Sequence, residues 1–321
     1  MSDHSQRGGT VSPPLRGHHL RNRVIAGHRQ AGPGKGSAAL TDLARIFIEL
    51  ITAYTRGGSL LLLLDFDGTL APIADDPGDV RLAAEVQEDL QVLARSSRIA
   101  LGIISGRSVR DLRAKVPIEE AIHAGCHGLE VSGPGLSFKH AGAQARRALL
   151  QAIARELEVR VAPIPGALVE SKGFAIAVHY RHVAGQDLGR LRSLVERVLR
   201  GRQHQVELLR GKKAYEIVPR VRWNKGLCGL WLLDCLQGRL PSPITTLYVG
   251  DDQGGERAFR ALSGSAVTVR VGSAKTRSPA ALRIPTVIDV QGLLSVLADE
   301  IGRRVEPWNL SDEMISGPEP R

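Results

Sequence analysis

Two carboxylates lie two residues apart, directly after the most apolar stretch of the sequence. Residues 60–64 are all leucine, and Asp65 and Asp67 follow within Asp-Phe-Asp-Gly-Thr-Leu. Open α/β sheets bind ligands at the carboxyl ends of their strands, and alternate residues of an extended segment point to the same side. Like charges this close repel each other, and a hard cation that prefers oxygen ligands relieves the repulsion. The spacing therefore predicts a Mg²⁺ site that shares its ion with a phosphate, in preference to a simple Asp-Gly turn.

Further polar residues follow other apolar segments, at places where ligands are expected. Ser105 ends the run Ile-Ala-Leu-Gly-Ile-Ile and can hydrogen-bond a phosphoryl oxygen, although Ser-Gly turns are common after strands. Lys225 lies at a predicted helix start that Asn224 can cap and where the helix dipole favours an anion. Asp251 and Asp252 follow Leu-Tyr-Val-Gly. Each position alone has an ordinary structural explanation, and their joint occurrence indicates a site.

Hydrophobic segments alternate in a way that predicts repeated strand–helix units on both sides of the middle of the chain. This rhythm indicates an α/β protein with a doubly wound, Rossmann-like parallel sheet, formed by residues 42–139 and 220–305. The expected elements are helix 42–54, a strand ending at Asp65, helix 83–95, strand 98–104, helix 108–114, strand 121–126, helix 224–236, strand 244–249, helix 255–262, strands 266–271 and 285–288, and helix 291–301.

The middle of the chain has a different rhythm, with strands in pairs and helices between the pairs. This pattern predicts an α+β cap domain with a mainly antiparallel sheet, inserted into the core at residues 140–219. A cleft between core and cap is the natural place for a ligand. The expected elements are helix 142–159, strands 167–169 and 174–180, helix 187–200, and strands 205–209 and 213–218.

The net charge of +10 is unevenly distributed along the chain. About half of it comes from the first 40 residues, which are rich in Gly, Pro, His and Ser, so residues 1–41 are expected to be a disordered basic arm. Three interpretations stay open: a tail without a specific partner, a transit peptide, or an arm that contacts nucleic acid or an anionic membrane. Nucleic-acid binding is not expected as the main function. Residues 306–321, rich in Pro, Ser and Glu, are expected to fray.

The three cysteines and the lengths of the apolar runs bear on the compartment. Cys126, Cys228 and Cys235 have no metal-ligand spacing, and their odd number points to a reducing compartment. The longest apolar run is far shorter than the roughly 20 residues that cross a bilayer. We therefore expect a soluble cytoplasmic protein without a membrane partner, and a monomer.

The segment after the leucine run resembles the first motif of the haloacid-dehalogenase-like phosphatases. Ser105, Lys225 and Asp251 follow in the order of that family's other motifs. The resemblance implies that Asp65 attacks phosphorus to form an aspartyl-phosphate. It implies that Asp67 protonates the leaving sugar oxygen and then activates the hydrolytic water. Ser105 and Lys225 would complete the catalytic set.

The same resemblance implies the ligands of the cation. Asp65, the backbone carbonyl of Asp67 and Asp251 would hold Mg²⁺, and Asp252 would orient waters and Lys225. One departure affects this network. The family usually continues after the two aspartates with a Thr-Asp-Glu run, whereas Gln-Gly-Gly-Glu follows here, so a carboxylate is missing at Gly255. Residue 256, a glutamate, is the remaining candidate to compensate, and catalytic rate is more in doubt than the fold.

Four further segments are similar to the trehalose-6-phosphate phosphatases, a similarity that spans roughly residues 59–300. They are Ala-Gly-Cys-His-Gly-Leu-Glu at 124–130, Glu-Ser-Lys at 170–172, His-Tyr-Arg at 179–181 and Gly-Lys-Lys-Ala-Tyr-Glu-Ile-Val-Pro at 211–219. The resemblance implies a neutral disaccharide phosphate as substrate, held by Arg107, His127, Glu170, Lys172, Lys212 and Glu216. Hydrolysis of trehalose 6-phosphate is the leading interpretation. A phosphatase of another sugar phosphate and a sensor that binds without turnover are the alternatives.

Overall fold

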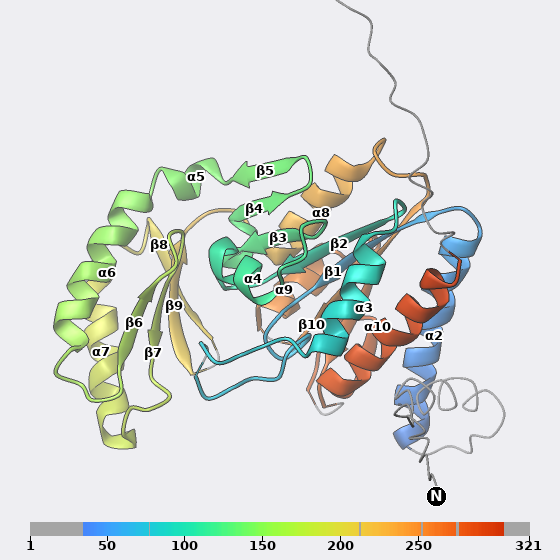
Figure 1. Ribbon diagram of the computed structural model, residues 1–321. Helices are drawn as coiled ribbons and strands as arrows, with labels where there is room; N and C mark the ends of the chain where they lie inside the picture. The colour runs from blue at the N-terminus through green and yellow to red at the C-terminus, as the bar shows by residue number, and fades with distance from the viewer. Residues whose placement is uncertain (1–34, 77, 212, 252, 274–275, 305–321) are drawn as a thin grey trace, which may run out of the picture.

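The computed structural model describes residues 35–76, 78–211, 213–251, 253–273 and 276–304. The predicted arm up to residue 34 and the tail from residue 305 therefore lie outside the described residues, as do Lys212 and Asp252. Figure 1 shows a large sheet with helices on both faces, and a smaller sheet with its own helices beside it.

The large sheet has eight strands in the order β12-β11-β10-β1-β2-β3-β4-β5. It is parallel from β12 to β3 and antiparallel from β3 to β5. Its strands are β1 (Ser59–Leu64), β2 (Ile99–Ile104), β3 (Ile122–Gly125), β4 (Glu130–Gly133), β5 (Leu136–Lys139), β10 (Ile244–Gly250), β11 (Val267–Val271) and β12 (Leu282–Ile284).

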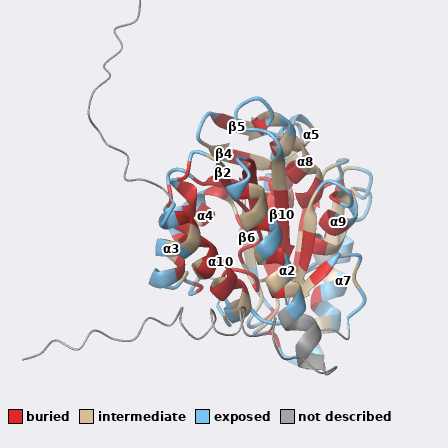
Figure 2. Ribbon diagram, turned by 90° about the vertical axis from the view of Figure 1, so that its right-hand side faces the viewer, coloured by how far each residue is buried: buried red, intermediate tan, exposed pale blue. Residues whose placement is uncertain are grey.

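The leucine run explains why β1 lies inside this sheet, because both of its faces are covered. Leu60, Leu62 and Leu64 pack in one core cluster, which includes residues of α2, α3 and α10, and Leu61 and Leu63 pack in another with residues of α8 and α9. Buried residues follow the strands of the sheet in Figure 2. The core helices are α2 (Lys35–Thr55), α3 (Ala84–Ala94), α4 (Val109–Lys115), α8 (Lys225–Leu236), α9 (Gln253–Ala261) and α10 (Val287–Gly302).

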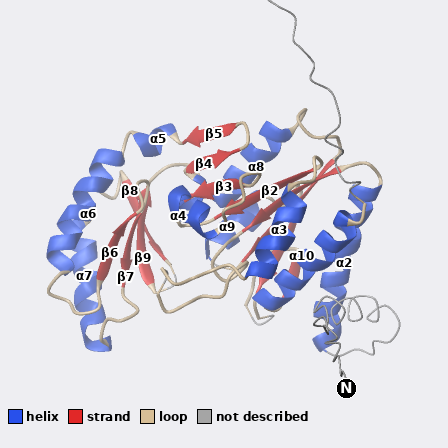
Figure 3. Cartoon of the chain, in the orientation of Figure 1, coloured by secondary structure: helices blue, strands red, loops and turns tan. Residues whose placement is uncertain are grey.

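The inserted segment forms a four-stranded antiparallel sheet in the order β6-β7-β9-β8 (Figure 3). A core cluster of its own packs this sheet against α6 and α7, with Ile153, Leu157, Leu191 and Ile217 fully buried. Its elements are α5 (Ala141–Gln144), α6 (Arg147–Val161), β6 (Leu168–Ser171), β7 (Ile176–His179), α7 (Leu188–Val198), β8 (Val206–Arg210) and β9 (Ala214–Pro219). We call this unit the cap. The parallel core sheet with its cap confirms the predicted fold class.

Four expectations about single elements need correction. Helix α2 begins at Lys35, so residues 35–41 are helical although they were assigned to the arm. The helix expected at 142–159 is two helices, α5 and α6. The hairpin β4–β5 was not predicted. The strand expected at 285–288 is wrong, because β12 ends at residue 284 and Thr286 caps α10 by accepting a hydrogen bond from the amide of Asp289.

Two general expectations also bear on the structure. Within the described ranges, no helix is both long enough and apolar enough to traverse a bilayer. All three cysteines are free thiols, with Cys126 and Cys228 buried and Cys235 partly exposed.

Candidate active site

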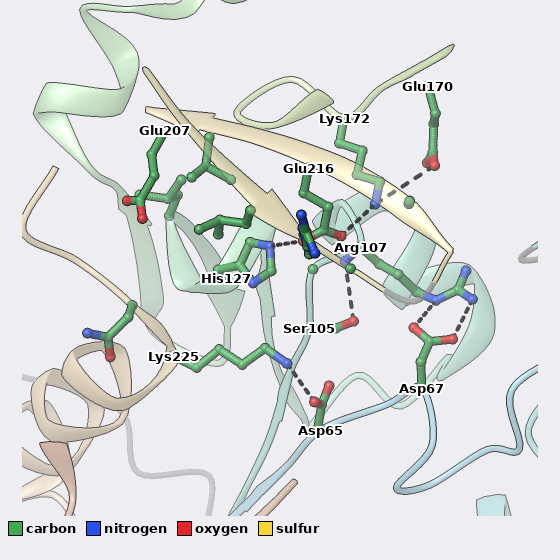
Figure 4. A pocket seen from close by; sticks show the side chains of 18 of the residues that line it. Asp65, Asp67, Ser105, Arg107, His127, Glu170, Lys172, Glu207, Glu216 and Lys225 are labelled. Atoms are coloured by element: carbon green, nitrogen blue, oxygen red, sulfur yellow. Dashed lines mark hydrogen bonds and ion pairs between the residues drawn. The ribbon is translucent and has the colours of Figure 1, made fainter. Parts of the chain in front are cut away.

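A pocket lies between the carboxyl ends of the central core strands and the cap sheet. Nine of the predicted site residues line it, and Figure 4 shows most of their side chains converging on one space. They are Asp65, Asp67, Ser105, Arg107, His127, Glu170, Lys172, Glu216 and Lys225. Asp251 directly follows β10 and is not among the pocket-lining residues, and Lys212 and Asp252 are not among the described residues.

Asp65 lies at the base of the pocket in a buried ion pair. Its Oδ2 atom is 2.5 Å from Nζ of Lys225, and the two side chains are only 3% and 2% exposed. Its Oδ1 atom accepts a hydrogen bond from the amide of Phe66 at 2.8 Å. Lys225 begins α8, whose first turn is capped by Asn224 through bonds from the amides of Gly226 and Leu227. The strand end and the helix start therefore fix both charges.

Asp67 points to Arg107, as Figure 4 shows. Nε and Nη2 of Arg107 each donate to one Asp67 oxygen at 2.7 Å, which is a bidentate pair. The third nitrogen, Nη1, donates to Asp111 at 2.6 Å. Although burial lowers it, these two carboxylates raise the pKa of Arg107 above its ordinary value. Arg107 was predicted to hold the sugar, and its donors are directed at protein carboxylates.

Ser105 follows β2 and is buried at the pocket wall beside Asp65. Its amide donates to the carbonyl of Ala124 and its carbonyl accepts from the amide of His127, so β3 and the turn after it fix its backbone. Its hydroxyl oxygen accepts from the amide of Arg107 at 3.2 Å. A serine hydroxyl that accepts one hydrogen bond can still donate another, and Ser105 lines the pocket, so it can donate to an anionic oxygen there.

Basic and acidic side chains alternate along the upper wall of the pocket, which is formed by the cap and by His127 of the core. His127 Nε2 lies 2.9 Å from Glu216, and Lys172 Nζ lies 3.8 Å from both Glu216 and Glu170. His179 Nε2 is 2.8 Å from Glu170. The pair between His127 and Glu216 joins the core to the cap.

These neighbours determine the ionisation of the two glutamates. Burial alone would raise the pKa of Glu216, but the charges of His127 and Lys172 outweigh it and lower the value to about 2. Burial likewise opposes the shift at Glu170, and the hydrogen bond from His179 holds its pKa below the usual value. The cap therefore presents ionised carboxylates and a lysine to the ligand.

His127 belongs to a short stretch with unusual backbone geometry. Cys126 and His127 have φ angles of 49° and 61°, in the left-handed region that side chains rarely adopt. The turn carries the imidazole against Gly106, where an added Cβ would lie 3.0 Å from Cε1 of His127 and 3.3 Å from Oε1 of Glu216. The absence of a side chain at Gly106 thus allows this pair to lie directly on the loop of Ser105.

The residues expected to hold a cation emerge from neighbouring strands. Strands β1 and β10 pair in parallel with Leu64 opposite Val249, and the amide of Asp65 donates to the Val249 carbonyl. Asp251 therefore leaves the adjacent strand at the same edge. Carboxylate oxygens are ligands that Mg²⁺ prefers, so the donor set fits that ion. Among the described residues no three acids, histidines or cysteines already form a metal-binding group, and the ligand set stays a prediction.

Several pocket residues were not predicted from the sequence as site residues. His179 ends β7 and Arg181 lies in the turn after it, and the available signal was the resemblance that already singled out this segment. Glu207 and Arg257 also line the pocket and pair at 2.9 Å between β8 and α9. The sequence gives no signal for this pair, because the two residues are 50 positions apart.

Solved structures share this arrangement of core and cap. A haloacid dehalogenase-like hydrolase from Bacteroides thetaiotaomicron superimposes with a TM-score of 0.52 at 15% identity, over 77% of this chain and 100% of that one. The C-terminal domain of trehalose-6-phosphate phosphatase from C. albicans gives 0.65 at 22% identity, over 79% and 96%. The chain therefore has the haloacid-dehalogenase-like fold, and its pocket holds an aspartate paired to a buried lysine at the end of the first core strand.

Comparison of sequences narrows the class. The family profile described as trehalose-phosphatase matches residues 63–282. A trehalose-phosphate phosphatase from Mycobacterium ulcerans is 32% identical over 277 residues, which cover 80% of this chain and 70% of that protein. The chain belongs to the trehalose-phosphatase family.

Proposed function

We propose that the protein hydrolyses trehalose 6-phosphate to trehalose and inorganic phosphate, the last step in making trehalose, and that it requires Mg²⁺. The observation that carries this proposal is one pocket with two chemically different walls. Its base holds Asp65 with Lys225, and its upper wall holds the charges of Glu170, Lys172 and Glu216. The base suits a phosphate, and the cap offers donors and acceptors to the hydroxyls of a neutral sugar.

In the first half of the proposed reaction, a carboxylate oxygen of Asp65 forms a bond to phosphorus and the bond from phosphorus to the sugar oxygen breaks. A proton from Asp67 goes to the leaving oxygen, which releases trehalose and leaves an aspartyl-phosphate. Lys225, 2.5 Å from Asp65, offsets negative charge as carboxylate and phosphate approach. The hydroxyl of Ser105 donates to a phosphoryl oxygen.

In the second half, Asp67 takes a proton from water while the water oxygen bonds to phosphorus. The bond between phosphorus and Asp65 breaks, which releases phosphate and restores the nucleophile. When bound, Mg²⁺ would neutralise phosphate charge, held by oxygens of Asp65, Asp67 and Asp251 with Asp252 nearby. The pair of His127 and Glu216 joins the cap to the core at the upper wall of the pocket.

Phosphate release from a panel of sugar phosphates tests the proposal. We expect trehalose 6-phosphate to be hydrolysed with a kcat/KM at least about tenfold above sucrose 6-phosphate and glucose 6-phosphate, and only with Mg²⁺ present. Equal rates across the panel would remove the substrate assignment and leave a phosphatase of another or broader specificity. Activity that survives exhaustive chelation would remove the Mg²⁺ requirement.

The variant Asp65→Asn separates an enzyme from a sensor that binds without turnover. We expect it to lose essentially all phosphate release and to keep its affinity for trehalose 6-phosphate, measured by calorimetry. Trapping the phosphorylated protein with labelled substrate, and locating the label at Asp65 by mass spectrometry, tests the covalent intermediate. Wild-type protein that binds the sugar phosphate but releases no phosphate would establish the sensor. Monomeric state and cytoplasmic location remain predictions, which light scattering and cell fractionation test.

A further inference from the structure

Three of the five N–H donors of the Arg107 guanidinium group are directed at two carboxylates. Nε and Nη2 bind the two oxygens of Asp67, and Nη1 binds Oδ2 of Asp111 at 2.6 Å. The side chain is 9% exposed, and its Cζ lies 5.2 Å from the centre of the Phe66 ring. The planar group is therefore held along two edges and one face, so its orientation depends on both carboxylates.

Helix α4 in turn fixes Asp111. Ser108 caps the helix by accepting a hydrogen bond from the amide of Asp111 at 3.1 Å. Nζ of Lys115 lies 3.9 Å from the other Asp111 oxygen. The same ammonium donates to the carbonyls of Gly78 and Val80 at 3.0 Å and 2.9 Å, which ties the helix to the loop that follows the catalytic motif. The Asp111 carboxylate, although its side chain is 37% exposed, thus has a positively charged partner near each of its oxygens.

We propose that Asp111 is a positioning residue for the reaction, acting through Arg107 to hold the carboxylate of Asp67. This inference rests on the proposed function, in which Asp67 moves protons at the leaving oxygen and at the attacking water. Proton transfer contributes roughly 10²- to 10⁴-fold to rate, and a misplacement of about 1 Å can cost about 100-fold. Without Asp111, Nη1 loses its carboxylate partner. The guanidinium that binds both oxygens of Asp67 is then held less firmly in its orientation.

A kinetic cycle tests the inference. In otherwise wild-type protein, Asp111→Ala, which removes the acceptor of Nη1, is expected to lower kcat for trehalose 6-phosphate about 10- to 100-fold, with KM within about twofold. In the Asp67→Asn background, where residue 67 can no longer exchange a proton, the same change should alter the residual rate by less than about twofold. Glu196→Gln, which breaks an exposed Arg–Glu pair with the same four-residue spacing on α7, is the matched control and should leave kcat unchanged.

Two results would overturn the inference in that cycle. An equal loss of kcat in both backgrounds would show that Asp111 matters only for the structure of α4, and a rise in KM at constant kcat would show that it acts on sugar binding. A second readout does not depend on activity. In side-chain NMR spectra, the Nη signals of Arg107, assigned with Arg107→Lys, should be separate in wild type and merge through faster rotation in Asp111→Ala.

The NMR readout also separates failure of the inference from failure of the proposed function. If the wild type releases no phosphate from trehalose 6-phosphate, the proposed function fails, and the Arg107 signals still decide whether Asp111 restrains the guanidinium. Unchanged signals in Asp111→Ala would refute the positioning role whatever the activity.

Discussion

The ion pair between Asp65 and Lys225 allows a sharp prediction about stability. Both side chains are almost fully buried, and their charged atoms are 2.5 Å apart. Lys225→Met keeps the length and the apolar stem of the side chain but removes the ammonium group. The Asp65 carboxylate then stays buried without the ammonium group, and it keeps the hydrogen bond from the amide of Phe66. Activity should fall with it, because the phosphate and Asp65 would face each other without an intervening cation.

The expected loss of stability follows from this geometry. Removing one partner of a buried pair costs about 3–5 kcal/mol, because the remaining charge is desolvated without compensation. For a protein of this size class, a change of 1 kcal/mol shifts Tm by roughly 2–4 °C. We therefore expect Lys225→Met to lower Tm by about 6–20 °C. The double variant Asp65→Asn/Lys225→Met should recover most of the loss, because the Asn carbonyl can still accept from Phe66 and neither residue of the pair then carries a charge.

Thermal and denaturant unfolding at pH 7, with chelator present to exclude metal effects, measures these differences. Lys139→Met is the matched control, because Nζ of Lys139 lies 3.6 Å from Glu130 but its side chain is 50% exposed. That exposed pair should be worth less than about 1 kcal/mol. The reasoning is refuted if Lys225→Met unfolds within about 3 °C of wild type, or if the double variant is less stable than Lys225→Met alone.

Three further predictions concern the cap contact and the thiols. The folded pKa of Glu216 is about 2, well below the unfolded value near 4.5. Glu216 therefore contributes about 3 kcal/mol of stability above pH 4.5, which is lost as the pH falls toward 2. In denaturant titrations across that range, Glu216→Gln should flatten this loss. At pH 8 a thiol reagent should react with Cys235 alone in the native protein, because burial raises the pKa of the other two thiols to about 12. After unfolding it should react with all three thiols. Reaction of three thiols in the native protein would contradict the burial of Cys126 and Cys228. Gly106→Ala should raise KM for the sugar phosphate several-fold by pushing His127 from Glu216, while Gly185→Ala, with open space at its Cβ, should not; equal KM values in both would dismiss the close contact.

Local chemistry explains which elements the sequence predicts. Strand β1 follows from its leucines, since only a strand covered on both faces needs an unbroken apolar run. Helix α8 follows from Asn224, which caps it in the structure. Segment 285–288 was wrongly predicted as a strand because Val287 and Ile288 are β-branched and apolar. In the structure Thr286 is a helix cap, and these two residues are the first of α10. The hairpin β4–β5 has two four-residue strands, too short for a clear alternation.

The candidate site divides in the same way. Asp65 and Lys225 could be predicted as site residues because Asp65 directly follows a strand and Lys225 begins a helix. Both positions lie at the edge of the sheet where ligands bind. Arg107 also reaches the pocket as expected, yet its partners could not be read from the chain. Asp67 lies 40 residues away, and which side chain a guanidinium meets depends on how β1 and β2 pair. Sequence position thus predicts that a residue belongs to the site, and packing decides what it touches.

The missing carboxylate at Gly255 illustrates that distinction. The sequence offered Glu256 as its replacement, but in the structure Glu256 forms an ion pair with Arg270 on β11, with both side chains largely buried. Arg257, the next residue, is directed to Glu207 of the cap. The charged side chains in this first part of α9 are therefore engaged away from Asp65. Recruiting Glu256 to a cation would break a largely buried pair and leave Arg270 uncompensated, which costs more than the loss of an exposed pair. The oxygens expected to serve a cation here are thus those of Asp65, Asp67 and the Asp251–Asp252 pair, with water completing its shell.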